Sequence, residues 1–254
     1  TGLGSVFLKK KKSYFLFSAI IKFLYTSHNK IIFQNLDDAK LIYGKKFKKS
    51  TFTFIPGTGI DTTLFKPSLK KFNNKVINFY MISRIIKDKG VFEYFDAVKN
   101  ISSQFPRAKF NYVGDFDFEN PSVISKEIFF HHIKKLNIRY FKFFKNIKII
   151  LNKSDCIVHP SYREGLSRVL LESASMQVPI ITTRVAGCKE IVKDKYNGFL
   201  CKPRCANDLA KSISKFIELT HKEKKKMSQN GRNLIKDKFD QKIIIKRYLK
   251  LLNE

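Results

Sequence analysis

Two glutamates separated by seven residues, Glu164 and Glu172, stand out in the segment 159–172, which reads His-Pro-Ser-Tyr-Arg-Glu-Gly-Leu-Ser-Arg-Val-Leu-Leu-Glu. An apolar run precedes this segment and a helical pattern follows, so Glu164 falls at a strand-to-helix turn and Glu172 on the helix. Open α/β sheets bind nucleotides outside the carboxyl ends of their strands. The pair is therefore typical of a ligand site in which Glu164 reaches sugar hydroxyls and Glu172 a ribose.

The start of the same helix offers groups for binding an anion. The amides of Gly165, Leu166 and Ser167 would point out of the helix N-terminus and could hold a diphosphate. On these residues alone a second interpretation stays open, a surface helix that carries two solvated glutamates, because this spacing by itself is a weak signal. At roughly 100° per residue, Glu172 lies about 130° from the apolar face of the helix.

A sheet is needed to position these residues, and the sequence predicts one. Apolar runs alternate with helical patterns from residue 76 onward, which indicates a doubly wound α/β sheet of parallel strands. We expect strands at 76–82, 109–113, 137–144, 156–159 and 178–183, and helices at 91–103, 147–153 and 166–176, followed by a basic helical tail that is densest in lysine at 222–226. A separate piece precedes them, with strands at 30–34 and 51–55, a helix at 37–45 and a linker that extends to residue 75.

Further motifs occur in the order found in glycosyltransferase family 4, and the chain resembles that family over essentially its whole length. These motifs are Ile55-Pro-Gly-Thr-Gly-Ile-Asp61 through Pro67, Ser83-Arg84 with Lys87-Asp-Lys-Gly90, Pro160-Ser161 with Glu164-Gly165 and Glu172, Val178-Pro-Ile-Ile181, Ala186-Gly187 with Glu190, and Asn197-Gly-Phe-Leu200. The residues 1–4 and 33–35 resemble pieces of the family's N-terminal domain. The resemblance implies the α/β fold of the GT-B type, with one complete Rossmann-like C-terminal domain and the remnant of a Rossmann-like N-terminal domain.

The domain limits that follow are 1–67 for the acceptor-side remnant, 68–235 for the nucleotide-sugar-binding domain and 236–254 for a C-terminal helix that returns toward the first domain. Roughly 100 residues of a two-domain enzyme would then be missing, judged from usual domain sizes. They would include most of the acceptor pocket and the family's N-terminal catalytic histidine. His28 is expected to be an ordinary surface residue.

The resemblance implies a role for each matching residue. The implied catalytic residues are Arg84, Lys89 and Glu164, and the implied donor-binding residues are Ser83, Gly165, Leu166, Ser167, Glu172, Gly187 and Glu190. Arg84 and Lys89 would offset the charge that develops on the departing nucleotide diphosphate. Arg84 and Lys89 could alternatively be ordinary surface charges in a lysine-rich chain. Glu190 could equally be a charge at a helix N-terminus.

No metal cofactor is implied, because Arg and Lys take the place of a divalent ion in such families. Asp115-Phe116-Asp117 could in principle hold a cation, but its position after a strand end favours a solvated acidic loop. The chain departs from the family at Ser83, where a Gly is usual and a Ser would crowd the diphosphate. Lys142 and Phe143 occupy a region where a Gly close to the base is usual.

The function implied is that of a retaining glycosyltransferase. It would transfer a hexose or N-acetylhexosamine from a UDP-sugar donor to a lipid-linked, lipopolysaccharide or capsule glycan. The alternative is a catalytically incomplete donor-binding fragment or one half of a split enzyme. A third hypothesis, a nucleic-acid-binding Rossmann domain, rests on charge alone.

The net charge of +29 suits an anionic partner, although an excess of lysine is also what an AT-rich genome would encode. We expect an anionic inner membrane surface rather than nucleic acid, because lysine far outnumbers arginine and no known nucleic-acid motif is present. The basic residues 9–12 and the amphipathic stretch 14–24 suit a membrane surface, although a core helix would show the same pattern. With no signal peptide or membrane span in the sequence, a cytoplasmic location is expected, with peripheral contact to the inner face of the membrane.

Overall fold

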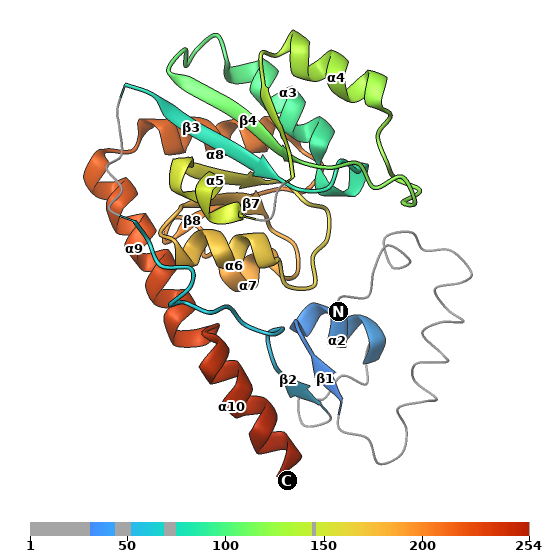
Figure 1. Ribbon diagram of the computed structural model, residues 1–254, viewed down its shortest axis with the longest axis vertical. Coiled ribbons are helices and arrows are strands. Elements are labelled where there is room, and N and C mark those ends of the chain that lie inside the picture. Colours follow the sequence, from blue (N-terminus) through green and yellow to red (C-terminus); the bar gives the residue numbers. More distant parts are fainter. Residues whose placement is uncertain (1–30, 44–51, 69–74, 144–145, 254) are drawn as a thin grey trace.

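The computed structural model describes residues 31–43, 52–68, 75–143 and 146–253, which form a large parallel sheet with its helices and a small second sheet (Figure 1). The basic residues 9–12, the amphipathic stretch 14–24 and His28 lie outside the described residues. The larger sheet has six strands in the order β5-β4-β3-β6-β7-β8, and every neighbouring pair is parallel. Its strands are β3 (Ile77–Ile82), β4 (Ala108–Gly114), β5 (Arg139–Lys142), β6 (Cys156–His159), β7 (Ile180–Thr183) and β8 (Gly198–Cys201).

Helices cover both faces of this sheet, as the near-continuous apolar character of its central strands requires. The connecting helices are α3 (Val91–Ile101), α4 (Lys126–Lys135), α5 (Ile147–Lys153), α6 (Arg168–Ser175), α7 (Cys188–Ile191), α8 (Ala206–Glu218) and α9 (His221–Lys238), with the short 3-10 helix η4 (Lys87–Lys89) ahead of α3. Strand β3 shows the two faces: Phe79 and Met81 pack in a core with α3 and α8, and Tyr80 and Ile82 pack in a second core with α5 and α6.

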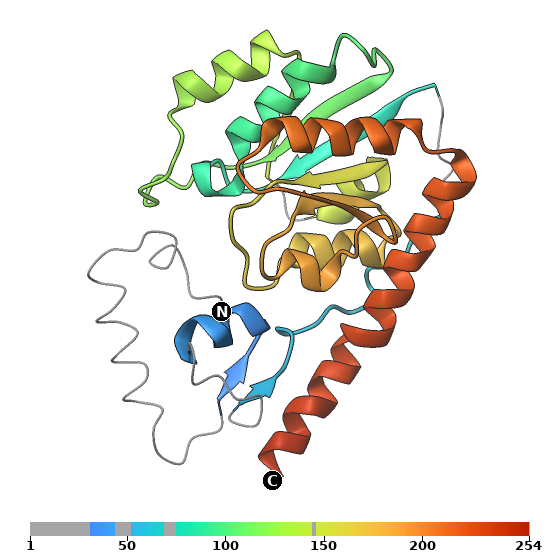
Figure 2. The ribbon, with the colours of Figure 1, turned by 180° about the vertical axis from the view of Figure 1, so that it is seen from behind.

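The smaller sheet consists of two short parallel strands, β1 (Ile32–Phe33) and β2 (Thr53–Phe54), with helix α2 (Leu36–Tyr43) between them. Helices α9 and α10 (Gln241–Leu252) follow each other and together extend from the large sheet to the small one, as both views show (Figures 1 and 2). Between the two helices the chain is hydrogen-bonded to Ile60 of the linker: Ile60 N donates to Phe239 O at 2.9 Å, and Gln241 N donates to Ile60 O at 2.9 Å. The C-terminal helix therefore returns toward the N-terminal part of the chain.

Most predicted elements occur with shifted ends. Strand β6 and helix α5 match their predicted limits of 156–159 and 147–153. The strand predicted at 137–144 is shorter, because Asn137 has a φ of 51° and belongs to the turn after α4. The C-terminal helix does not begin at 236, since α9 continues to Lys238 and the chain turns at Phe239–Asp240.

Helices α9 and α4 begin with side chains that satisfy free backbone amides of their first turn. Helix α9 begins with a capping box, in which the Thr220 side chain accepts from Glu223 N and the Glu223 carboxylate accepts from Thr220 N. Ser125 caps α4 by accepting from Ile128 N. None of the helices in the described part of the chain is long and apolar enough to cross a bilayer.

Candidate functional site

The centre of the large sheet is a topological switch point. From β3 the chain moves outward through β4 to β5, whereas from β6 it moves the other way through β7 to β8. Ligands of open α/β sheets bind at such points, beyond the carboxyl ends of the two strands. The loop after β3 carries Arg84 and Lys89, and the loop after β6 carries Glu164, so the topology places the predicted groups at one end of the sheet.

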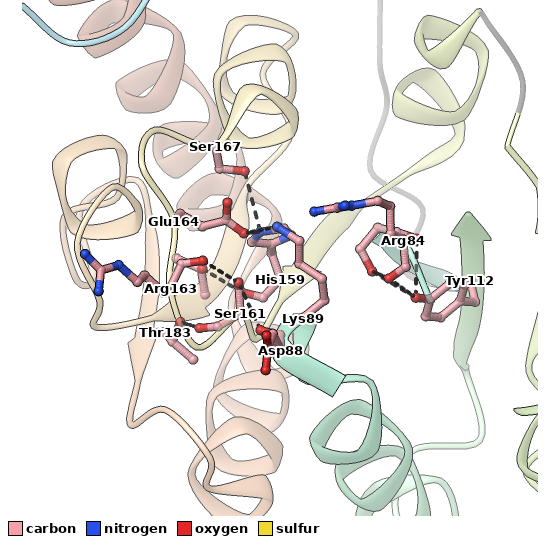
Figure 3. Close-up of polar contacts among 12 residues, drawn as sticks. Arg84, Asp88, Lys89, Tyr112, His159, Ser161, Arg163, Glu164, Ser167 and Thr183 are labelled. Atoms are coloured by element: carbon pink, nitrogen blue, oxygen red, sulfur yellow. Dashed lines mark hydrogen bonds and ion pairs between the residues drawn. The ribbon is translucent and has the colours of Figure 1, made fainter. Parts of the chain in front are cut away.

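Lys89 and Glu164 form the centre of the site (Figure 3). Lys89 Nζ lies 2.6 Å from Glu164 Oε1, and the two side chains are only 17% and 12% exposed. The same carboxylate oxygen lies 2.8 Å from Nε2 of His159, which is the last residue of β6. Burial alone would raise the Glu164 pKa, but the hydrogen bond from His159 and the charge of Lys89 outweigh it and hold the pKa well below its usual range.

His159 was not among the predicted site residues. A carboxylate can only accept, so the short contact with Glu164 assigns the proton of the imidazole to Nε2. Nδ1 is buried and has no hydrogen-bond partner among the described residues. The signal in the sequence was a histidine at the end of a buried strand, directly before Pro160-Ser161.

The loop that carries Glu164 is tied to its surroundings by backbone-directed hydrogen bonds. Ser161 Oγ donates to Asp88 O at 3.4 Å and to Arg163 O at 3.1 Å, and Tyr162 N donates to Asp88 O at 2.9 Å. Thr183, at the end of β7, donates its hydroxyl to Ser161 O. The loops after β3, β6 and β7 thus hold one another, which fixes the main chain on both sides of the Lys89–Glu164 pair.

Gly187 allows a fourth segment to approach this loop. Its φ is +75°, and a Cβ at this position would lie 2.7 Å from Glu164 O and closer still to Gly165 O. An L-residue there would be strained both by its backbone and by contact with these carbonyls. The structure thus brings Gly187 next to the main chain of Glu164 and Gly165.

Helix α6 begins at Arg168, later than predicted. Ser167 is its N-cap residue, and Gly165 and Leu166 belong to the preceding loop. Leu166 packs against the core that contains Tyr80 and Ile82, and Ser167 is buried, with its Oγ 3.5 Å from His159 Nε2. The three predicted amide positions thus lie immediately ahead of the helix, beside Glu164.

Glu172 is buried rather than solvated. Its side chain is 9% exposed and pairs with Arg168 one turn earlier, at 2.9 Å between Oε1 and Nε. Burial raises its pKa, and the charge of Arg168 opposes that rise. Since the Glu164 side chain is also largely shielded and is paired with Lys89, the interpretation of a surface helix with two solvated glutamates is wrong.

Arg84 lies on the other side of the switch point and is more open. Its side chain is 58% exposed, and Nη1 lies 2.5 Å from Asp117 Oδ2. The hydroxyl of the preceding residue, Ser83, lies 2.8 Å from the Tyr112 hydroxyl. Tyr112 OH also lies 3.2 Å from Arg84 O, to which it can donate (Figure 3). Tyr112 is fully buried, and no sequence signal pointed to it.

The predicted acidic loop of Asp115 and Asp117 is paired with cations. Asp117 is held by Arg84, and Asp115 lies 3.9 Å from Lys142 Nζ. Over the described ranges no group of three or more His, Cys, Asp or Glu residues could hold a metal ion. The two carboxylates therefore balance nearby positive charge.

Glu190 does not join Glu164 in the structure. It lies on α7, where burial raises its pKa and the charges of Lys189, Asp37 and Lys238 act on it to a smaller extent.

Sequence reasoning also missed a contact from α2: Arg163 Nη2 lies 2.6 Å from Asp38 Oδ1. Nothing in the sequence connects these two residues, which are 125 positions apart.

Comparison with known proteins agrees with this architecture. The sequence profile of the glycosyl transferases group 1 family matches residues 62–234, more than half of the chain. The chain belongs to the glycosyl transferases group 1 family. The matched range contains Arg84, Lys89, Glu164 and Glu172, so the group 1 region of the chain includes the whole switch-point site.

Two relatives align with nearly all of this chain. An N,N'-diacetylbacillosaminyl-diphospho-undecaprenol alpha-1,3-N-acetylgalactosaminyltransferase from Campylobacter jejuni is 27% identical over 98% of the chain and 68% of its own length. The capsular polysaccharide biosynthesis glycosyltransferase CapM from Staphylococcus aureus is 26% identical over 94% of the chain and 62% of its own length. The chain thus spans about two thirds of the length of these relatives.

A solved structure shows the same fold. The chain superimposes on Anabaena HepE, crystallised in complex with UDP, with a TM-score of 0.80 and 20% identity, over 92% of this chain and 66% of the other. The architecture is therefore of the GT-B type, and its six-stranded domain has the Rossmann-like sheet that was predicted.

Proposed function

We propose that this chain binds the donor of a retaining glycosyltransferase of the family 4 type. The enzyme transfers a hexose or an N-acetylhexosamine from a UDP-sugar to a lipid-linked, lipopolysaccharide or capsule glycan. The observation that carries the proposal is the partly buried Lys89–Glu164 pair at the switch point, inside the range matched by the group 1 family. The UDP complex of Anabaena HepE, which has the same fold, supports the choice of nucleotide.

In this proposal each side of the switch point has its own task. During transfer the bond between the anomeric carbon and the donor diphosphate breaks, a bond to the acceptor oxygen forms, and the proton of the acceptor hydroxyl is released to solvent. Negative charge collects on the diphosphate, where the cations of Lys89 and Arg84 stabilise it. Glu164 accepts hydrogen bonds from the donor sugar, and Glu172 accepts them from the ribose.

The remaining donor contacts come from the backbone around these side chains. The amides of Gly165, Leu166 and Ser167 lie ahead of α6, where the positive end of the helix favours an anion. Because Gly187 has no side chain, its loop can pack directly against the segment that carries these amides. Glu190 lies farther away, on the side of α2. No metal cofactor is required in this arrangement, since Lys89 and Arg84 supply the positive charge.

Two observations support a lipid-linked glycan as the acceptor: the names of the relatives and the net charge of the chain. The Campylobacter jejuni relative is named for an acceptor sugar that is linked to diphospho-undecaprenol, and CapM is named for capsular polysaccharide biosynthesis. A chain with a net charge of +29 suits an anionic membrane surface where such lipids lie. We therefore place the protein in the cytoplasm, in peripheral contact with the inner face of the membrane, and assign it no nucleic-acid partner.

The proposal is tested by calorimetric titration of the purified chain with UDP and with a UDP-N-acetylhexosamine. Saturable binding in the micromolar range is expected, unchanged by a chelator and lost in both Glu172→Ala and Arg84→Ala. Circular dichroism checks that both variants are folded. Absence of binding by a folded wild-type chain would overturn the proposal.

A narrower function, donor binding without transfer, would need only the groups that the chain gathers at the switch point. A transfer assay with a lipid diphosphate sugar as acceptor separates the two. Binding without turnover supports the narrower function, and turnover supports the enzyme.

A further inference from the structure

The loop that carries Glu164 is contacted by a segment outside the large sheet. Asn35, just before α2, and Asp38, in its first turn, both reach this loop. Asn35 Nδ2 donates to Gly165 O at 3.2 Å, and Arg163 Nη2 donates to Asp38 Oδ1 at 2.6 Å. The two contacts therefore fall on the residues immediately before and after Glu164.

Asn35 and Asp38 are held in place by each other. Asp38 N donates to Asn35 Oδ1 at 2.8 Å, and Asn35 Nδ2 also donates to Asp38 Oδ2 at 3.0 Å. Both residues are buried, with Asn35 0% and Asp38 5% exposed. One carboxylate oxygen of Asp38 is thus occupied by Asn35, and the other faces Arg163.

These contacts complete the restraint of the loop. Hydrogen bonds from Ser161 and the approach of Gly187 hold its main chain from within the large sheet domain. The contacts from Asn35 and Asp38 come from residues 130 and 125 positions away, beside the small sheet. A shift of α2 relative to the large sheet must either break them or move Arg163 and Gly165, and Glu164 lies between those two residues.

We propose that Asp38 and Asn35 are positioning residues of the donor site: they fix Arg163 and Gly165 and thereby hold the Glu164 carboxylate against Lys89. Neither residue touches the donor in this arrangement. The inference rests on the proposed function, because Glu164 is assigned to the donor sugar there. It adds that correct placement of the sugar contact depends on the N-terminal part of the chain.

The neighbouring pair provides a matched control. Asp37, the residue before Asp38, pairs with Lys189 of α7 at 2.5 Å, and both side chains are 39% exposed. Exposed pairs contribute little to stability, whereas removing one partner of a buried pair leaves an uncompensated charge. Asp37→Asn therefore makes the same chemical change on the same helix and also removes a tie to the large sheet domain, without touching the Glu164 loop.

The first experiment compares donor affinities of the full chain by calorimetry. In Asp38→Asn the affinity for a UDP-N-acetylhexosamine should fall about tenfold, while the affinity for UDP should fall less, about two- to threefold. UDP keeps its contacts with Glu172 and Arg84, which have no described contact with Asp38, and is weakened only through the loop amides assigned to the diphosphate. Asp37→Asn should match the wild type for both ligands.

The second experiment needs no ligand. Hydrogen exchange of the apo chain, followed on peptides that cover 161–168, should be faster in Asp38→Asn than in Asp37→Asn, with α3 and α8 unchanged. Faster exchange throughout the molecule, or equal loss of UDP and UDP-sugar binding, would show a merely structural tie and overturn the inference. So would an Asp38→Asn variant that behaves like Asp37→Asn. If the wild type binds neither nucleotide, the donor proposal fails, and the exchange data still decide whether Asp38 positions the loop.

Discussion

Arg84 Nη1 lies 2.5 Å from Asp117 Oδ2, so the guanidinium assigned to the donor diphosphate is paired with a carboxylate of the β4–α4 loop. The two residues follow neighbouring strands, β3 and β4, and Arg84 keeps more than half of its side-chain surface exposed. An incoming diphosphate therefore competes with Asp117 for the same cation.

Replacing this competitor should improve donor binding. Exposed ion pairs contribute about 0–1 kcal/mol, so Asp117→Asn is expected to tighten UDP binding about two- to fivefold. Asp115→Asn serves as the control, because the Asp115 carboxylate lies 3.9 Å from Lys142 and does not contact Arg84. Calorimetric titration at low ionic strength measures both variants. Weaker UDP binding in Asp117→Asn would show that this carboxylate orients Arg84 for the donor instead of competing.

Gly187 should not tolerate a side chain. Gly187→Ala puts a Cβ against the carbonyls of Gly165 and Glu164 on a backbone with φ of +75°. We expect a loss of about 1–3 kcal/mol in the free energy of unfolding together with loss of UDP binding. Gly231→Ala, in the middle of α9, meets Ala174 at an ordinary 3.6 Å and should be neutral or stabilise by up to about 1 kcal/mol. Urea unfolding compares the two, and equal stability of both variants would contradict the packing described for the Gly187 loop.

The depressed pKa of Glu164 predicts an acid-sensitive contribution to stability. Because the folded-state pKa lies below the ordinary value of 4.5, this contribution is fully present above pH 4.5 and is lost as the pH falls through the folded pKa. Glu164→Gln leaves Lys89 without its partner and should cost about 2 kcal/mol at pH 7. The gap to the wild type, from urea unfolding, should stay constant between pH 8 and 5 and narrow below about pH 4.5. A gap that widens on acidification would reverse the assigned direction of the shift.

The pKa of Glu172 is shifted in the opposite direction, upward, and this shift predicts a pH dependence of donor binding. Burial raises its pKa, so the carboxylate that accepts from the ribose is protonated earlier than an exposed glutamate as the pH falls. UDP affinity of the wild type should therefore already decline at pH values somewhat above 4.5, where an exposed glutamate is still mostly ionised. Glu172→Gln should bind more weakly and lack this part of the decline. Arg168→Ala removes the charge that lowers the Glu172 pKa, so the UDP affinity of this variant should begin to decline at a higher pH than that of the wild type. If the two proteins show the same pH profile of UDP affinity, Glu172 is not the titrating group.

The sequence predicted the large sheet and the centre of the site because both depend on local patterns. Strand β6 was recognised from an apolar run that ends at Pro160, and Glu164 from its place at the strand-to-helix turn that follows, whereas Lys89 was singled out by the resemblance to glycosyltransferase family 4. Once neighbouring strands are parallel, the loops that follow them must lie at the same edge. The meeting of Lys89 with Glu164 therefore required the strand order and no further information.

Residues whose environment comes from distant segments could not be predicted in this way. Glu172 lies away from the apolar face of α6, yet it is buried, since Ser175 on that helix donates to Phe65 O of the linker and Ala174 packs against Gly231 of α9. Lys224, within the basic run 222–226, is 3% exposed and donates to Ile217 O. No periodicity in the local sequence encodes these partners.

The central place of β3 and β6 also bears on the order in which the molecule folds. Strands β3 and β4 are joined by one helix, so their pairing closes a short loop, whereas the pairing of Phe79 with Cys156 closes a loop about twice as long or more, because β4, α4, β5 and α5 lie between. Contacts between distant segments form slowly. We therefore expect the half that contains β3, β4 and β5 to gain structure before Lys89 meets Glu164, 75 residues away. Nascent or partly unfolded chains would then carry an ordered half-sheet while still lacking affinity for a nucleotide, so that acquisition of the ligand site marks the final stage of folding.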